Sequence, residues 1–187
     1  LQLKQDCNDL PGIAINLGSR GSFYLYTLND PVNSRDYLKQ DMDIVVRMGD
    51  EGARTGLLNK LAMCDWMEAE NTKDMAQTEK LKESAFDLAN ESYRNAMYLG
   101  REIDAHHAAK NIFSYGGDSK GHNKIINAMG KEIDNKKLWN EITSPYIKSE
   151  MLNALEKLAD TKGRGWVKTL KKTLAENIAK VKISEIV

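Results

Sequence analysis

The sequence predicts a mainly α-helical, bundle-like domain of about six or seven helices with a small β-hairpin near the N-terminus. Apolar residues recur at spacings of three and four over most of the chain, which is the period of one helix face. Between residues 12 and 28 the pattern changes, because short β-branched and aromatic runs flank a glycine-rich segment there. We expect a single domain over residues 1–187, with 1–10 poorly ordered, 12–28 forming the hairpin and 34–187 helical.

The composition excludes few classes of function. The chain has 187 residues, with 27 basic and 27 acidic side chains and a formal net charge of zero. This balance does not indicate nucleic-acid binding by the molecule as a whole. No apolar run approaches the roughly 20 residues that cross a bilayer, and no targeting segment is recognisable. We expect a soluble protein, and the sequence does not indicate the cellular compartment. Because the chain begins at Leu1 rather than Met, we interpret it as processed or shortened.

The predicted hairpin consists of two short strands. Residues 12–17 and 23–28 have the apolar, β-branched and aromatic content of strands, and Gly-Ser-Arg-Gly between them fits a loop. Opposed residues share a face, so the apolar residues of the first strand would lie beside Tyr24 and Tyr26 of the second. A two-stranded hairpin is marginally stable alone. This face is therefore expected either to pack on the helices or to bind another chain.

Two helices are predicted after the hairpin, with a bend between them. Pro31 ends the second strand, and Asn33 or Ser34 can cap the first helix. Residues 49–56 are rich in glycine and precede the second apolar helix. We interpret these glycines as a bend where helices approach closely. A phosphate-binding loop is the less favoured alternative, because two acidic residues in this segment would repel phosphate.

The longest helical stretch runs from Thr72 to Phe113 and is broken at Gly100. It ends at a stop signal made by residues 114–117, Ser-Tyr-Gly-Gly. Short helices follow, and Ser144-Pro145 is a favourable helix start. A brief turn before the last helix predicts an antiparallel helix pair. The apolar stripe of the long stretch consists of Leu81, Ala85, Leu88, Ser92, Ala96, Leu99 and Ile103.

Two short patterns resemble motifs of known families. Arg101 and His106 show the Arg-x4-His spacing of the HEPN ribonucleases, which are all-helical, although Glu102 departs from the small polar residue usual after the arginine. The resemblance implies that His106 acts as general acid or base and that Arg101 stabilises phosphate. Trp66 and Glu70 show the Trp-x-x-x-Glu spacing seen in bacterial exchange-factor effectors. We interpret that second spacing as a contact between residues one helical turn apart.

No metal, cofactor or nucleophile constellation is predicted. His106 and His107 have acidic neighbours on the same helix, but no second cluster of ligands is recognisable elsewhere in the chain. His107 falls near the middle of the apolar stripe, which predicts a hydrogen-bonded core histidine. Cys7 and Cys64 are far apart without metal-binding spacing, and we interpret them as free thiols, with a disulfide between them left open.

The C-terminal segment is basic. Its cations surround Trp166, and such a mixture can hold phosphates or a stacked base. The same lysines also fit the solvated face of an amphipathic helix, with Trp166 on its apolar side. Nucleic-acid binding is the lowest-ranked hypothesis and would use Arg164, Lys168, Lys171 and Lys172.

Binding to another macromolecule is the favoured functional hypothesis. The sequence lacks a recognisable catalytic constellation, whereas the aromatic hairpin offers a contact surface. We expect a non-catalytic interaction or adaptor-type domain whose partner is another protein or a second copy of the chain. Its predicted contact residues are Arg20, Tyr24 and Tyr26. The alternative is a small metal-independent ribonuclease that uses Arg101 and His106.

Overall fold

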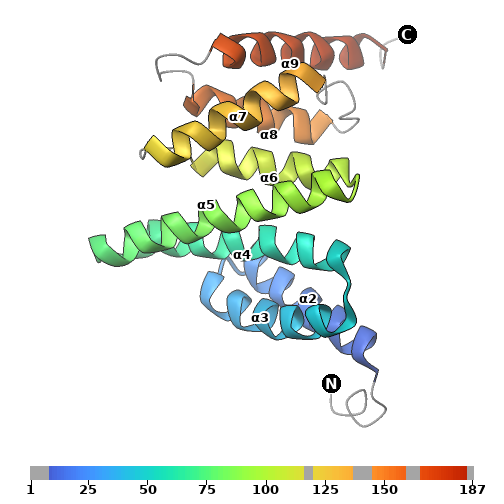
Figure 1. Cartoon of the computed structure of the whole chain (residues 1–187), viewed down its shortest axis with the longest axis vertical. Coiled ribbons are helices and arrows are strands. Elements are labelled where there is room, and N and C mark those ends of the chain that lie inside the picture. Colours follow the sequence, from blue (N-terminus) through green and yellow to red (C-terminus); the bar gives the residue numbers. More distant parts are fainter. Residues whose placement is uncertain (1–8, 116–119, 137–144, 159–164, 185–187) are drawn as a thin grey trace. The chain divides into compact units, whose positions relative to one another are not determined.

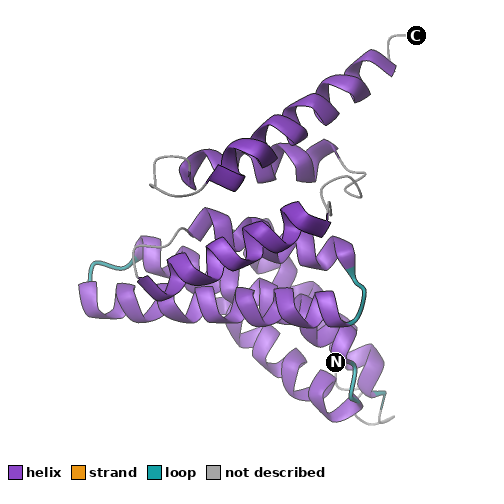
Figure 2. Ribbon diagram, turned by 45° about the horizontal axis from the view of Figure 1, so that its top comes forward, coloured by secondary structure: helices purple, strands orange, loops and turns teal. Residues whose placement is uncertain are grey.

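A computed structural model describes residues 9–115, 120–136, 145–158 and 165–184. Every regular element in these residues is a helix, and no strand occurs among them (Figure 2). The prediction of a mainly helical fold is confirmed. The helices are α2 (Leu10–Tyr26), α3 (Pro31–Met48), α4 (Glu51–Asn71), α5 (Met75–Tyr98), α6 (Glu102–Tyr115), α7 (Lys120–Lys136), α8 (Pro145–Leu158) and α9 (Gly165–Ser184) (Figure 1).

The predicted β-hairpin at residues 12–28 is wrong, because these residues belong to helix α2. Asp9 caps this helix by accepting a hydrogen bond from the Gly12 amide at 2.9 Å, and Pro11 lies in the first turn. The buried residues of α2 recur every four positions, which is a helical rather than a strand period. These buried residues are Ile13, Leu17, Gly21 and Leu25, and Gly12 and Ala14 beside them are also buried.

The glycines that were interpreted as a hairpin loop lie inside α2 and pack against α3. A Cβ atom at Gly21 would lie 2.6 Å from Leu38 Cδ2, and one at Gly18 would lie 2.5 Å from Asp41 Oδ2. The two pairs show that α2 and α3 run antiparallel at close range. Two of the β-branched and aromatic residues that favour a strand, Ile15 and Phe23, lie on the other side of the helix and are exposed.

Contacts divide the chain into two compact units, residues 1–104 and 105–187. In the first unit α2 packs on α3, α3 on α4, and α4 on α5. Its core contains Leu38, Val45, Leu57 and Leu61 together with Cys64, a buried free thiol. Three of these helices, α3, α4 and α5, follow short connections and are capped by an aspartate. Asp30, Asp50 and Asp74 each accept backbone amide hydrogen bonds from the first turn of the helix that follows. The single-domain expectation stays a prediction.

The predicted break in the long central stretch is confirmed. Helix α5 ends at Tyr98, Gly100 adopts a left-handed conformation with φ of 66°, and α6 begins at Glu102. Helix α5 begins later than the predicted start at Thr72, because Asp74 is its cap. The stripe also ends earlier than predicted, since Leu99 and Ile103 are exposed.

In the second unit the last helix, α9, packs against both α7 and α8. Its Trp166 is buried, and its indole Nε1 donates a hydrogen bond to Asn127 Oδ1 at 3.1 Å. The Trp166 ring lies 5.5 Å from the ring of Phe113 and packs directly on Gly130, where a Cβ would lie 2.5 Å from the indole. Trp166 therefore belongs to the core, as the apolar side of the last helix predicted. None of the described helices is long and apolar enough to span a membrane.

Candidate functional site

A groove of about 560 Å³ opens in the first unit, with walls from α2, α3 and α4. Small residues create much of its space, because glycine and alanine line it on α2 and α4. Apolar side chains form part of the walls, from Ile15, Val45, Met48 and Leu57. The charged side chains that line it are Asp41, Asp50, Lys60 and Arg101. Grooves of this kind, mostly apolar with a few polar groups, are the usual form of small-ligand sites.

Asp41 is the most unusual residue of this groove. It lies on the buried side of α3 between Leu38 and Val45, and only 6% of it is exposed. Its Oδ1 is fully buried and has no hydrogen-bond partner. Burial raises the pKa of Asp41 to about 6, and the nearby charge of Lys60 only partly opposes this rise. The folded unit therefore holds a carboxylate in a place that disfavours its charged form.

Lys60 faces Asp41 from α4 but does not form an ion pair with it. Its ammonium group instead donates to Ser22 Oγ at 2.9 Å, and that hydroxyl donates to the Gly18 carbonyl oxygen at 2.8 Å. Burial lowers the pKa of Lys60, while the charge of Asp41 acts in the opposite direction. The groove thus contains two opposite charges that are close enough to interact, and neither one neutralises the other by direct contact.

Gly56 contributes open space to the wall formed by α4. A Cβ built at this position meets nothing within 4 Å, in contrast to Gly18 and Gly21. The residue also lies within the helix, where glycine is roughly 1 kcal/mol less favourable than alanine. Neither close packing nor backbone conformation accounts for a glycine here, because α4 continues through it. Its absent side chain leaves the groove open.

The other end of the groove lies at the start of α4. Asp50 caps the helix by accepting from the Ala53 amide at 2.9 Å. The guanidinium of Arg101 passes over Gly52, and its Nε donates to the carboxylate of Asp104. Arg101 therefore has a partner already, but it still brings a second cation to the groove wall. No cluster of three metal-binding side chains occurs in the residues that the structure describes.

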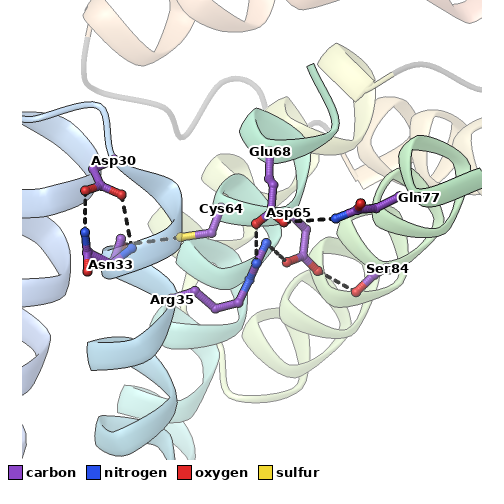
Figure 3. A network of polar contacts seen from close by, with 9 residues as sticks. Asp30, Asn33, Arg35, Cys64, Asp65, Glu68, Gln77 and Ser84 are labelled. Carbon is purple, nitrogen blue, oxygen red and sulfur yellow. Dashed lines mark hydrogen bonds and ion pairs between the residues drawn. The ribbon is translucent and has the colours of Figure 1, made fainter. Parts of the chain in front are cut away.

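A second polar cluster links α3, α4 and α5 (Figure 3). The Arg35 guanidinium lies between the carboxylates of Asp65 and Glu68, with an Nη2–Oδ1 distance of 2.6 Å to Asp65. Asp65 also accepts from the Ser84 hydroxyl, and Glu68 accepts from the Gln77 amide at 3.5 Å. Burial acts to lower the pKa of Arg35, but these two carboxylates hold it above its ordinary value. Because its charges contact one another, we interpret this network as a structural tie between helices.

The predicted partner-binding residues of the N-terminal segment do not share one face. Tyr24 stacks on Tyr37 of α3 with ring centroids 5.4 Å apart, and the Arg20 guanidinium lies 5.8 Å from the same Tyr37 ring. Tyr24 is half-buried in this contact. Tyr26, by contrast, is 59% exposed, and its hydroxyl lies 3.8 Å from Met63 Sδ. Only Tyr26 of the two tyrosines offers most of its surface to solvent.

The residues of the ribonuclease hypothesis occupy different environments. His106 is buried, with 4% of it exposed, and lies in α6. Arg101 precedes α6 and is about half exposed, with its partner Asp104. The prediction that His107 is the core histidine is wrong, because His106 takes the buried position and His107 is intermediate. The Trp66–Glu70 contact is confirmed, since the indole Nε1 donates to Glu70 Oε1 at 3.0 Å.

The basic residues of the C-terminal segment lie mainly on the surface of α9. Lys168 and Lys172 are exposed, and Lys171 is half-buried. Lys171 approaches Glu156 at 3.5 Å and Lys172 approaches Glu176 at 3.9 Å, so two of these cations have acidic neighbours. Arg164 lies outside the described residues.

Sequence reasoning missed Asp41 and Lys60 as site residues. One signal was available, because Asp41 follows Leu38 and precedes Val45 at helical spacing and therefore occupies a core position of α3. A charged residue at such a position is rare unless it is paired. No comparable signal marks Lys60, whose role depends on the packing of α4 against α2. A comparison of the chain with protein-family models finds no match, and a comparison with curated proteins finds no relative.

Proposed function

We propose that this chain is a non-catalytic module that binds another protein through the outer side of α2 and the first turn of α3. The observation that supports the proposal is a run of large apolar side chains that are each more than half exposed. They are Ile15, Phe23, Tyr26, Leu28 and Val32. Single exposed apolar residues are normal on protein surfaces, but four of these five fall between residues 23 and 32, where α2 ends and α3 begins, and such a concentration is typical of a contact surface.

The arrangement of these residues suits a partner helix. Ile15, Ser19, Phe23 and Tyr26 follow one another at spacings of three and four, so they lie along one side of α2. A ridge of this kind packs into the groove of an opposing helix. Phenylalanine and tyrosine are also enriched at the centres of protein interfaces. The opposite side of α2 packs against α3, whereas Ile15, Phe23 and Tyr26 on this side keep more than half of their surface exposed.

The test is a capture experiment with the double variant Phe23→Ser and Tyr26→Ser. We expect the wild-type chain to retain a protein partner from a native lysate and the variant to lose it. Both residues are exposed, so helical circular dichroism and melting should remain close to those of the wild type. The matched control is Met75→Ser with Tyr98→Ser, since both residues are exposed apolar side chains of α5.

Three results would contradict the proposal. Equal capture by the variant and the wild type would show that this surface is not the contact. Loss of capture in the control pair would show an effect of general surface hydrophobicity. Recovery of RNA in place of protein would favour the ribonuclease or nucleic-acid alternatives. A concentration-dependent mass in analytical ultracentrifugation that the double variant abolishes would identify the partner as a second copy of the chain.

A further inference from the structure

The groove in the first unit contains an unsatisfied acceptor and an incompletely satisfied donor. Asp41 Oδ1 has no hydrogen-bond partner although Asp41 is 6% exposed. Buried polar atoms are paired in the great majority of cases, so an unpaired carboxylate oxygen requires an explanation. The ammonium group of Lys60 has three donors, of which one is directed to Ser22 Oγ. Both groups line the same groove.

The missing partners define the chemistry of an occupant. A carboxylate that lacks a donor is best satisfied by a charged amine, and an ammonium group by a carboxylate. The two groups do not reach each other directly, so one ligand that carries both charges can lie between them. The walls beside them are apolar, through Ile15, Val45 and Leu57. The space left at Gly56 lies in the same wall.

We propose that this groove binds a small zwitterion of the α-amino-acid type with an apolar side chain. Its ammonium group pairs with Asp41, its carboxylate pairs with Lys60, and its side chain contacts the apolar walls. Gly56 keeps the space that the ligand occupies. The inference does not depend on the protein-binding proposal, because it rests on the charged groups Asp41 and Lys60 of the groove, although Ile15 contributes to both surfaces.

The other charged groups at the groove are compatible with this ligand. Arg101 supplies a second cation at the wall, and Asp50 is engaged as the cap of α4. Helix α2 contributes Ser19 and Ser22, which do not titrate. Occupation by an ammonium group requires Asp41 to be ionised, so binding should strengthen as the pH rises through about 6. An affinity about tenfold weaker near pH 5 than near pH 7.5 is expected from the fraction of Asp41 that is ionised.

The test is calorimetric titration of the full chain with leucine and two analogues that each lack one charge. Isocaproate has the same carbon skeleton as leucine without the amine, and isoamylamine lacks the carboxylate. We expect leucine to bind more tightly than either. Asp41→Asn should weaken leucine binding about 10- to 100-fold, which is the usual effect of losing a charged hydrogen bond. The matched control is Asp43→Asn, an exposed residue of the same helix.

A second variant tests the space rather than the charge. Gly56→Leu should abolish leucine binding while the protein remains folded, because a Cβ at this position meets nothing within 4 Å. Circular dichroism and melting of each variant verify the fold. The inference is overturned if leucine does not bind the folded wild type, if isocaproate binds equally well, or if either groove variant binds leucine as the wild type does.

Discussion

Replacement of Asp41 by asparagine should stabilise the protein at neutral pH and leave it unchanged in acid. The pKa of Asp41 is raised from 3.8 to about 6 by burial. A difference of about two pKa units corresponds to roughly 3 kcal/mol of preference for the neutral carboxylic acid over the carboxylate. Asparagine resembles the neutral form in shape and carries no charge. We therefore expect Asp41→Asn to be about 3 kcal/mol more stable than the wild type above pH 7.

The sign of this effect follows from proton binding. A carboxyl group whose pKa is higher in the folded state binds its proton more tightly there than in the unfolded chain. Its favourable contribution is complete below the unfolded pKa of 3.8 and is lost as the pH rises to about 6. Asp50, Lys60 and Arg101 are the other charged groups at the groove, and of these Lys60 opposes the rise in the pKa of Asp41.

Urea unfolding, followed by circular dichroism between about pH 4 and pH 7.5, measures this difference. Most other titrating groups affect both proteins equally, so the difference in unfolding free energy isolates Asp41. Asp43→Asn serves as the control, because Asp43 is exposed on the same helix and its substitution should have little effect at any pH. A variant that is less stable than the wild type near pH 7.5, or a difference that is independent of pH, would refute the assignment of Asp41 as a desolvated carboxylate.

Two further predictions concern packing and ion pairing, and urea unfolding tests both. Gly56→Ala should stabilise the protein by about 0.5–1 kcal/mol, because it improves helix propensity in open space. Gly21→Ala should instead destabilise it by about 1–3 kcal/mol, since the new Cβ meets α3, and equal effects at the two glycines would contradict this contrast. Arg35→Met should cost about 3–5 kcal/mol because it leaves two mostly buried carboxylates without their cation. Arg54→Met, which removes a more exposed pair of contacts, should cost less than about 1 kcal/mol, and a larger loss there than at Arg35 would disprove the structural role of the network.

Local signals in the sequence were sufficient where a helix ends at a residue that acts alone, whereas α3 and α5 begin at aspartate caps that were not predicted. The break at Gly100 is an example, because a glycine in the left-handed conformation ends a helix regardless of its distant neighbours. Helix α2 was missed because its most strand-like residues, such as Ile15 and Phe23, lie on the exposed side. Strand propensity reflects the side-chain environment, and tertiary packing overrides it here.

The groove was less predictable than the helices that form it. The position of Asp41 on the apolar side of α3 is visible from spacing, but its depth of burial results from Gly18 on a neighbouring helix. The structural role of a glycine also depends on which atoms of the neighbouring helix lie next to it. Gly18 and Gly21 admit close packing, whereas Gly56 faces open space. Such differences arise between elements distant in sequence, so a single sequence does not reveal them.

The contrast between the two sides of α2 has a consequence for mutational tolerance. Substitutions at the inner positions either replace a glycine by a larger residue or shorten a core side chain such as Leu17 or Leu25. Both changes disturb the packing and lower the stability of the fold. Outer positions such as Ile15 and Phe23 are more than half exposed, so new side chains there change mainly the surface that the helix presents. In a deep mutational scan that selects for folding, positions of α2 that tolerate substitution and positions that do not should therefore recur with the helical period. The exposed side of α2 can thus diverge in sequence while the fold of this unit is retained.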